Sequence, residues 1–258
     1  MSEMINKRAL VLGADAIGQG IAIRFAREGA RVAVLDPDIA VADETARLIR
    51  ADGGHAFAVQ TALDESVGTA VKKATEELGG LDVLVNNVLP TPVIGPIENQ
   101  SASAFGEAFG RIQAAVCAMQ AALPAMQRAG SGRIINVGHR YGENINEGIA
   151  AYNAAAWSLV GLTRTAAVDW GQYQIATNLL LPLADTPELR RCHERRPGVI
   201  DLMINQLPLG RVGDPIEDIG ATALFLAGEA CNFVNGEIIH GDGGQHVAGP
   251  VLNPAKFG

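Results

Sequence analysis

The sequence predicts an α/β fold in which one doubly wound parallel sheet is flanked by helices on both faces. Two observations predict it. Short aliphatic runs, typical of buried parallel strands, alternate with longer segments of helical periodicity along the chain. The first run also ends in a glycine-rich loop, residues 13–20, where a helical pattern begins. No linker or low-complexity tract interrupts this alternation, so residues 1–258 are expected to form a single domain.

The first half of the chain contains four expected strands, each a short apolar run bounded by charged residues or glycine. In chain order they are residues 9–12, 31–35, 55–60 and 82–85. Between the strands, apolar residues recur at helical spacing, and Gly29 provides a stop signal after the first helix. The helices predicted from this spacing are residues 17–28, 38–51 and 65–78.

The second half repeats the pattern with longer helices. Helices are expected at 101–129, 149–171 and 215–228, and strands at 133–137, 175–181 and near 237–239. The stretch 183–212 shows no clear period and is expected to be irregular. Because strands separated by helices of this length are joined by right-handed crossovers, the whole pattern indicates a Rossmann-type sheet.

Composition excludes several classes of protein. With 48% hydrophobic and 19% charged residues, a chain of 258 residues can bury a sizeable core. The net charge of −8 argues against nucleic-acid and membrane-surface partners, since both require a basic face. No apolar run reaches membrane-spanning length, and the start lacks an apolar signal core. The three cysteines are far apart, which indicates reduced thiols in a cytoplasmic protein and no metal site.

The chain resembles the short-chain dehydrogenase/reductase family over essentially its whole length, because a series of landmarks occurs in the family's order. These landmarks are Gly13 and Gly18 after the first strand, Asp36 after the second, Asn86-Asn87 after the fourth, Tyr152 at the start of a helix after the fifth, Pro182 after the sixth, and Gly241-Asp242-Gly243-Gly244 near the end. The resemblance implies an oxidoreductase with a dinucleotide site at the carboxyl edge of the sheet.

The resemblance assigns Gly13, Gly18, Asp36 and Asn86 to cofactor binding. Asp36 stands where the family places an acidic residue on the adenosine ribose, which favours NAD; its alternative role is to cap the following helix. The loop is about one residue shorter than the family's, and Asp15 occupies the middle position of a G-x-G-x-x-G pattern. A carboxylate ~4 Å from a phosphate is repelled by roughly 4 kcal/mol at an effective dielectric of ~20. The alternative for this loop is a tight turn that needs glycine only for φ and packing.

Other positions that contact the cofactor in the family are also replaced. Ala62 stands where an aspartate lies beside the adenine, and Leu183 replaces the glycine beside the nicotinamide. Val88-Leu89 replaces the small residues that leave room for the nicotinamide ribose. These replacements predict that this chain itself binds no NAD.

The proton-transfer residues of the family, Asn, Ser, Tyr and Lys, are reduced to Tyr152. Ala156 stands in place of the lysine, and no lysine occurs between Lys73 and Lys256. The lysine's charge normally lowers the tyrosine pKa, so that the phenol passes a proton near neutral pH. His139 aligns with the serine and Arg111 with the asparagine.

Three functions are compatible with these replacements. A redox-neutral isomerase or lyase could use Tyr152 and His139 for proton transfer, with Arg111 lowering the tyrosine pKa. An atypical NAD-dependent oxidoreductase is the second. The third, a redox-silent subunit in which Tyr152 is vestigial, explains the losses at both sites most simply.

A silent subunit requires a partner. Resemblance to heteromeric family members with a degenerate, non-catalytic subunit predicts a heterotetramer with an active dehydrogenase paralogue that binds NAD; a homo-oligomer is the alternative. The expected contacts are alanine-rich helix faces, whose alternative role is packing on the chain's own sheet: Ala114, Ala115, Ala118, Ala121, Ala122, Ala154, Ala155, Ala166 and Ala167.

A basic segment lies where the family keeps its substrate-covering segment: Arg190, Arg191, Arg195 and Arg196. Arginine forks suit phosphate recognition, so this segment could bind the nucleotide part of an acyl-coenzyme A. The substrate of the complex would then be a 3-hydroxyacyl-CoA in aromatic catabolism. A solvated helix surface is the alternative.

Overall fold

The computed structural model describes residues 4–139, 148–195 and 198–248 of the chain. Among these residues, seven parallel strands form one sheet in the order β3-β2-β1-β4-β5-β6-β7. The strands are β1 (Arg8–Leu12), β2 (Arg31–Asp36), β3 (His55–Gln60), β4 (Val83–Asn86), β5 (Gly132–Val137), β6 (Ile175–Pro182) and β7 (Ile238–Gly241). The predicted doubly wound parallel sheet is therefore confirmed.

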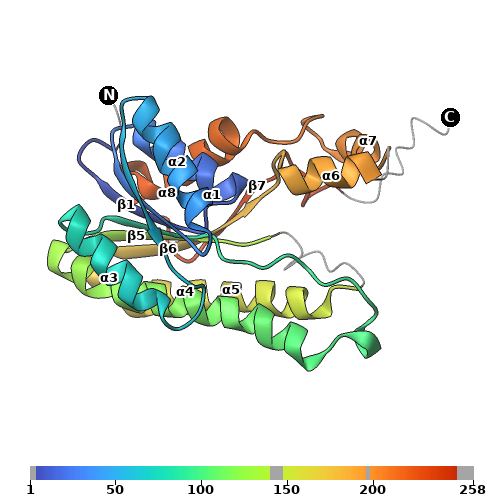
Figure 1. The fold of residues 1–258 in the computed structure, drawn as a ribbon, viewed down its shortest axis with the longest axis horizontal. Helices are drawn as coiled ribbons and strands as arrows, with labels where there is room; N and C mark the ends of the chain where they lie inside the picture. The colour runs from blue at the N-terminus through green and yellow to red at the C-terminus, as the bar shows by residue number, and fades with distance from the viewer. Residues whose placement is uncertain (1–3, 140–147, 196–197, 249–258) are drawn as a thin grey trace.

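Helices cover both faces of the sheet (Figure 1). One layer contains α1 (Ala16–Arg27), α2 (Ile39–Ala51), the π-helical turn η4 (Pro215–Ile219) and α8 (Gly220–Ala227). The opposite layer contains α3 (Val67–Leu78), α4 (Ala102–Ala129) and α5 (Ala150–Trp170). With η4 and α8 taken together as one expected helix, each helix lies within two residues of its expected bounds. An amphipathic helix between buried strands leaves a clear apolar period.

The stretch predicted to be irregular contains two helices, α6 (Pro187–Arg195) and α7 (Val199–Gln206), so that prediction is wrong there. The reason is visible in α6, none of whose residues is buried. A helix without a buried face has no apolar period to detect. In Figure 1, α6 and α7 lie beside the sheet at the end where β6 and β7 terminate.

The alanine-rich faces of α4 and α5 are occupied within the chain. Most of their alanines are buried in the single chain: Ala114, Ala115, Ala118, Ala121, Ala122, Ala155, Ala166 and Ala167. The α4 alanines pack in the core between this helix layer and the sheet. The expectation that these alanines form a subunit contact is therefore corrected, and packing on the chain's own sheet accounts for them.

An ion pair joins β1 to the residue just before β4. Asp82 accepts hydrogen bonds from the Arg8 backbone N–H at 2.8 Å, from Nε at 2.8 Å and from Nη2 at 2.9 Å. Desolvation raises the pKa of Asp82, but its hydrogen bonds and the Arg8 charge together outweigh this and hold the pKa below its usual value. The pair stabilises the register of β1 against β4 at the amino end of the sheet.

Asp82→Asn is expected to lower the free energy of unfolding at pH 7 by about 1–2 kcal/mol, because it removes the charge that Arg8 binds. A carboxyl with a depressed folded-state pKa stabilises the fold above its unfolded pKa, about 3.9, and loses this effect as the pH falls through the lower folded value. Urea unfolding at pH 7 and pH 3 should therefore show a smaller difference between variant and wild type at pH 3. Glu44→Gln, at an exposed pair with Arg47, is the matched control and should change neither measurement. An equal deficit at both pH values would contradict the role of the Asp82 charge.

No helix in the described ranges combines the length and apolar character that crossing a membrane requires.

Candidate active site

The residues of the candidate site come from the carboxyl ends of neighbouring strands. Of the predicted residues, Gly13 follows β1, His139 follows β5 and Tyr152 lies in the first turn of α5; Asp15 and Asn87, which follow β1 and β4, lie at the same edge. The carboxyl ends of parallel strands meet at one edge of the sheet, where open α/β sheets bind ligands. The fold therefore brings these residues to one edge, as the sequence predicts.

Tyr152 and His139 lie next to one another. Their ring centroids are 6.0 Å apart and the rings meet edge to face at 78°. Tyr152 is buried, with 7% of its surface exposed, and His139 is partly buried. The structure thus brings together the two residues that the sequence indicates for proton transfer.

The position of the missing lysine is closed by apolar side chains. Ala156 is 3% exposed and packs with Ile149 and Tyr152, and Leu89 lies against this cluster. Arg111 lies partly buried on α4, and among the described residues no hydrogen bond joins it to Tyr152. The aliphatic groups of Ile149, Ala156 and Leu89 pack beside the tyrosine ring, on the side where the family keeps its lysine.

The glycine-rich loop is held by its own aspartate. Oδ1 of Asp15 accepts hydrogen bonds from the backbone N–H groups of Ile17 at 3.0 Å and Gly18 at 3.1 Å, and so caps α1. The same oxygen accepts a 2.7 Å hydrogen bond from Nδ2 of Asn87. Asp15 is exposed on its outer side, but the groups around its carboxylate desolvate it enough to raise its pKa in spite of these bonds. The donors that a dinucleotide pyrophosphate would use are therefore already bonded within the chain.

The two glycines are required by packing within the chain. Gly13 has a φ of 87°, and a Cβ on it would lie 1.9 Å from the backbone oxygen of Asn87. A Cβ on Gly18 would lie 1.8 Å from the backbone oxygen of Gly13. Such contacts leave no space for a side chain at either position, so the glycines are needed whether or not a cofactor binds.

Asp36 ties the loop to the start of α2. Its Oδ2 accepts from the Ala14 N–H at 2.8 Å, and its Oδ1 accepts from the Asp38 N–H at 2.9 Å. The residue that caps α2 is Asp38, whose carboxylate accepts from the Ala40 N–H at 2.9 Å. The helix-capping alternative for Asp36 is thus corrected, because the cap lies two residues further along.

Asn86 lies inside the sheet. It is 1% exposed, and its Nδ2 donates to Oδ1 of Asn136 on β5 at 2.9 Å. Asn136 in turn donates to Thr163 Oγ1 on α5 at 2.9 Å.

The neighbouring Asn87 is the residue that reaches the loop, a role that the sequence analysis missed. The Asn-Asn pair was the available signal, but only the register of β4 shows which amide faces the loop.

The arginines of α6 are engaged by acids close in sequence. Arg190 pairs with Asp185 at 2.8 Å and Arg191 with Glu188 at 2.7 Å, and all four side chains are at least 40% exposed. Arg195 is exposed, and Arg196 lies outside the described residues. Glu188 also acts on the loop, because its charge is one of the causes that raise the pKa of Asp15. The segment therefore carries an acidic charge that acts on the glycine-rich loop as well as basic side chains.

The residues at this edge do not fit a dinucleotide in the family's usual way. Asp15 occupies the phosphate donors, and Glu188 adds a second negative charge. Leu183 is partly buried and uses its N–H to bond the Gly241 oxygen at 2.9 Å. Ala62, at the adenine position, offers only a methyl group.

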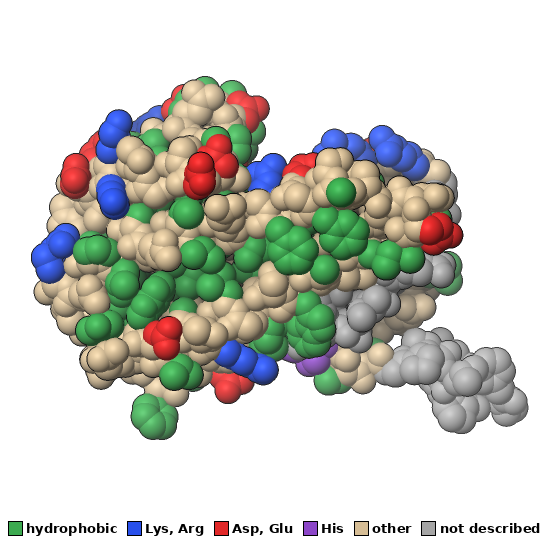
Figure 2. Space-filling model, turned by 90° about the horizontal axis from the view of Figure 1, so that it is seen from below, with side chains coloured by type: hydrophobic (Ala, Val, Ile, Leu, Met, Phe, Trp, Pro, Cys, Tyr) green, Lys and Arg blue, Asp and Glu red, His purple; other side chains and the backbone are tan. Residues whose placement is uncertain are grey.

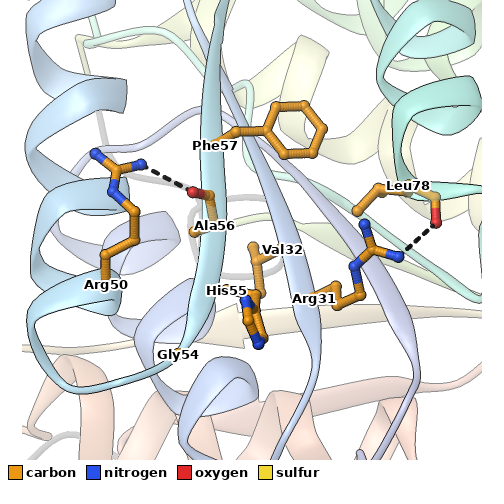
Figure 3. Close-up of a pocket in the computed structure, with 8 residues that line it drawn as sticks. All are labelled: Arg31, Val32, Arg50, Gly54, His55, Ala56, Phe57 and Leu78. Carbon is orange, nitrogen blue, oxygen red and sulfur yellow. Dashed lines mark hydrogen bonds between the residues drawn. The ribbon is translucent and has the colours of Figure 1, made fainter.

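A cavity of about 210 Å³ lies at the opposite, amino-terminal edge of the sheet, between β2, β3 and the end of α3 (Figure 3). Its two arginines bind backbone oxygens of the chain. Arg50 donates to the Ala56 oxygen on edge strand β3 at 2.8 Å, and Arg31 donates to the Leu78 oxygen at the end of α3 at 3.3 Å. Both arginines thus satisfy strand-edge and helix-end carbonyls. The cavity is remote from Tyr152 and is not part of the candidate site.

Comparison with known proteins agrees with this architecture. The family model described as enoyl-(acyl carrier protein) reductase matches residues 11–246. The 3-oxoacyl-[acyl-carrier-protein] reductase FabG of Staphylococcus epidermidis is 32% identical over 253 residues, covering 94% of this chain and 100% of that protein. A Bacillus subtilis protein described as a 2,4-dienoyl-CoA reductase is 29% identical over 262 residues, covering 98% and 100%.

A solved structure extends the similarity to the backbone. It is described as an NAD(P)-dependent gluconate 5-dehydrogenase from Beutenbergia cavernae with bound NADP at low occupancy. It superposes with a TM-score of 0.84 at 31% identity, covering 95% of this chain and 99% of that chain. Together with the family match, this shows that the chain belongs to the short-chain dehydrogenase/reductase family of oxidoreductases.

Proposed function

We propose that this family member is a redox-silent subunit that partners an active, NAD-dependent dehydrogenase paralogue. The observation that carries the proposal is the environment of Tyr152. Ala156 and Ile149 pack against the ring where the family keeps an ammonium group. The methyl group of Ala156 cannot supply the positive charge by which the family's lysine lowers the tyrosine pKa and helps it pass a proton at neutral pH.

The cofactor loop supports the same proposal. Hydride transfer needs a bound nicotinamide, and here Asp15 holds the N–H donors of the loop. Two independent requirements of the family's chemistry are weakened in one chain. Loss of a single residue could be compensated, whereas loss at both sites favours a subunit whose NAD is bound by its partner.

Exposed apolar side chains support a subunit contact. On α4 and α5, Phe109 is 44% exposed, Trp157 50% and Val168 81%. Figure 2, which views the face covered by α3, α4 and α5, shows hydrophobic side chains gathered across it. Burial of aromatic and aliphatic groups of this size stabilises an interface. We propose that this face, through these larger side chains, contacts the paralogue in a heterotetramer, with a homo-oligomer as the alternative.

The proposed complex is similar in kind to 2-[hydroxy(phenyl)methyl]succinyl-CoA dehydrogenase, which pairs an active subunit with a degenerate one. Similarity to a protein described as a 2,4-dienoyl-CoA reductase supports a substrate of the acyl-CoA class. The partner would then oxidise a 3-hydroxyacyl-CoA in aromatic catabolism. Of the described arginines in the basic segment, Arg195 is the better candidate for its phosphates, since Arg190 and Arg191 are paired with acids.

Calorimetric titration of the purified chain with NADH tests the silent role, and native mass spectrometry of the chain co-expressed with an intact Tyr-x-x-x-Lys paralogue tests the partnership. We expect no heat of NADH binding to the chain alone and a defined complex with the paralogue. Micromolar binding of NADH together with turnover by the chain alone would overturn the proposal.

A redox-neutral isomerase or lyase is the second candidate, because His139 and Tyr152 are in ring contact. The variant Tyr152→Phe distinguishes the two candidate functions, since it keeps the packing against Ile149 and Ala156 and removes only the hydroxyl. For a silent subunit, we expect the turnover number of the assembled complex to stay within about twofold of wild type, because the variant removes no group on the reaction path. A loss of roughly a hundredfold or more, in a reaction that needs no nicotinamide, would instead identify Tyr152 as a proton-transfer residue.

A further inference from the structure

The amino end of α1 already holds an anion, and that anion belongs to the chain. Asp15 Oδ1 lies 3.0 Å from the Ile17 nitrogen and 3.1 Å from the Gly18 nitrogen. These are the second and third N–H groups of the helix, which point along its axis and carry the positive end of its dipole. An external phosphate bound at a helix start uses these groups.

A third donor, Asn87, also holds the carboxylate. Its Nδ2 donates a 2.7 Å hydrogen bond to the same Oδ1 and a 3.2 Å bond to the Gly13 oxygen, so it links the end of β4 to the loop at two points. The close approach of Gly18 to the Gly13 oxygen keeps the loop compact. A phosphate entering here would have to displace the carboxylate from all three donors.

The surrounding charge also disfavours an incoming anion. Glu188 of α6 is close enough for its charge to act on Asp15. Glu188 is also paired with Arg191 of the same helix at 2.7 Å. A diphosphate at the loop would therefore meet the carboxylate of Asp15 and, in addition, the charge of Glu188 on α6.

We propose that Asp15 is the residue that excludes a nucleotide diphosphate from this chain, by occupying the phosphate position of the loop with its own carboxylate. The inference rests on the proposed redox-silent function and identifies the Asp15 carboxylate as the group that prevents the cofactor from binding. It implies that the closed loop is complete without a ligand, and that the donors of the loop remain able to bind an anion once the carboxylate is removed.

The test uses Asp15→Gly and Asp15→Ser with inorganic pyrophosphate as the probe. Glycine empties the position, whereas serine keeps a neutral cap and protects the fold if the glycine variant melts too early. Thermal unfolding with and without pyrophosphate should show no shift for wild type and a rise in melting temperature for both variants. Titration should give pyrophosphate affinity roughly tenfold to a thousandfold tighter than wild type, as expected for removal of one like charge at about 4 Å.

Asp214→Gly is the matched control. Asp214 caps η4 in the same way, accepting from the Ile216 and Glu217 N–H groups at 2.8 Å each. Its removal should lower the melting temperature as Asp15→Gly does, but Glu217 and Asp218 in that first turn should prevent any response to pyrophosphate. A response by Asp214→Gly equal to that of Asp15→Gly would show a nonspecific salt effect and overturn the inference.

The inference and the proposed function can fail separately. If wild type binds pyrophosphate as tightly as both Asp15 variants, or neither variant gains affinity, Asp15 does not exclude the diphosphate, even if the chain remains inactive with NADH. If the Asp15 variants gain affinity while wild type nevertheless turns over NADH alone, the silent function is wrong, and Asp15 weakens diphosphate binding without excluding the dinucleotide.

Discussion

Ala156→Lys is expected to lower the free energy of unfolding by roughly 3–5 kcal/mol and to produce no NADH-dependent turnover. The new ammonium would replace a methyl group that is 3% exposed and packs against Ile149 and Tyr152. Burial of an unpaired charge lowers the lysine pKa, so the deficit should shrink as the pH rises toward about 10. Urea unfolding at pH 7 and pH 9.5 measures both effects.

The control for this variant is Thr165→Lys, which adds the same side chain to the same helix at an exposed position. We expect its stability to stay within about 0.5 kcal/mol of wild type. Turnover of NADH by Ala156→Lys would show that the missing lysine is the main defect, and would contradict the conclusion that the cofactor loop is also closed.

Gly18→Ala is expected to cost about 3 kcal/mol or more, because its Cβ would lie 1.8 Å from the Gly13 backbone oxygen. The oxygen belongs to a loop that Asn87 and Asp36 hold on both sides, so it cannot move away cheaply. Measurement of urea unfolding of the chain without any nucleotide tests whether the glycine serves the fold itself.

Gly110→Ala is the matched control on α4, where a Cβ would meet nothing within 4 Å. Alanine there should stabilise the chain by about 0.5–1 kcal/mol, since it favours the helix and lowers the entropy of the unfolded chain. If Gly18→Ala proved as stable as wild type, the interpretation of the loop as a packed, self-contained turn would be wrong.

Spacing in the sequence was enough to predict which side chains lie next to Tyr152. Counting from Tyr152 identified both Ala156 and His139, and the structure places all three at the same edge of the sheet with the two rings in contact. Spacing was sufficient because one turn of helix separates Tyr152 from Ala156, and a parallel strand ends just before His139. Local geometry of this kind varies little once the elements form.

The cofactor side could be predicted only in part. Asp15 was recognised as an obstacle to phosphate, but the sequence shows neither that its carboxylate bonds the Gly18 N–H nor that Asn87 joins it. The capping role given to Asp36 belongs to Asp38. The sequence pattern does not fix the start of a helix to within two residues, because the boundary depends on which side chain reaches the free N–H groups.

The alternation of apolar runs and helical periods determined the doubly wound sheet. A parallel strand is buried on both faces and therefore appears as an apolar run, whichever apolar residues form it. The sequence alone likewise determined that the family's lysine is absent, because alanine stands at position 156. Tertiary structure alone decided where α6 lies, which amide reaches the loop, and that most of the alanines of α4 and α5 are buried within the chain. These features depend on contacts between residues far apart in the sequence, whose distances and directions are set only when the layers pack.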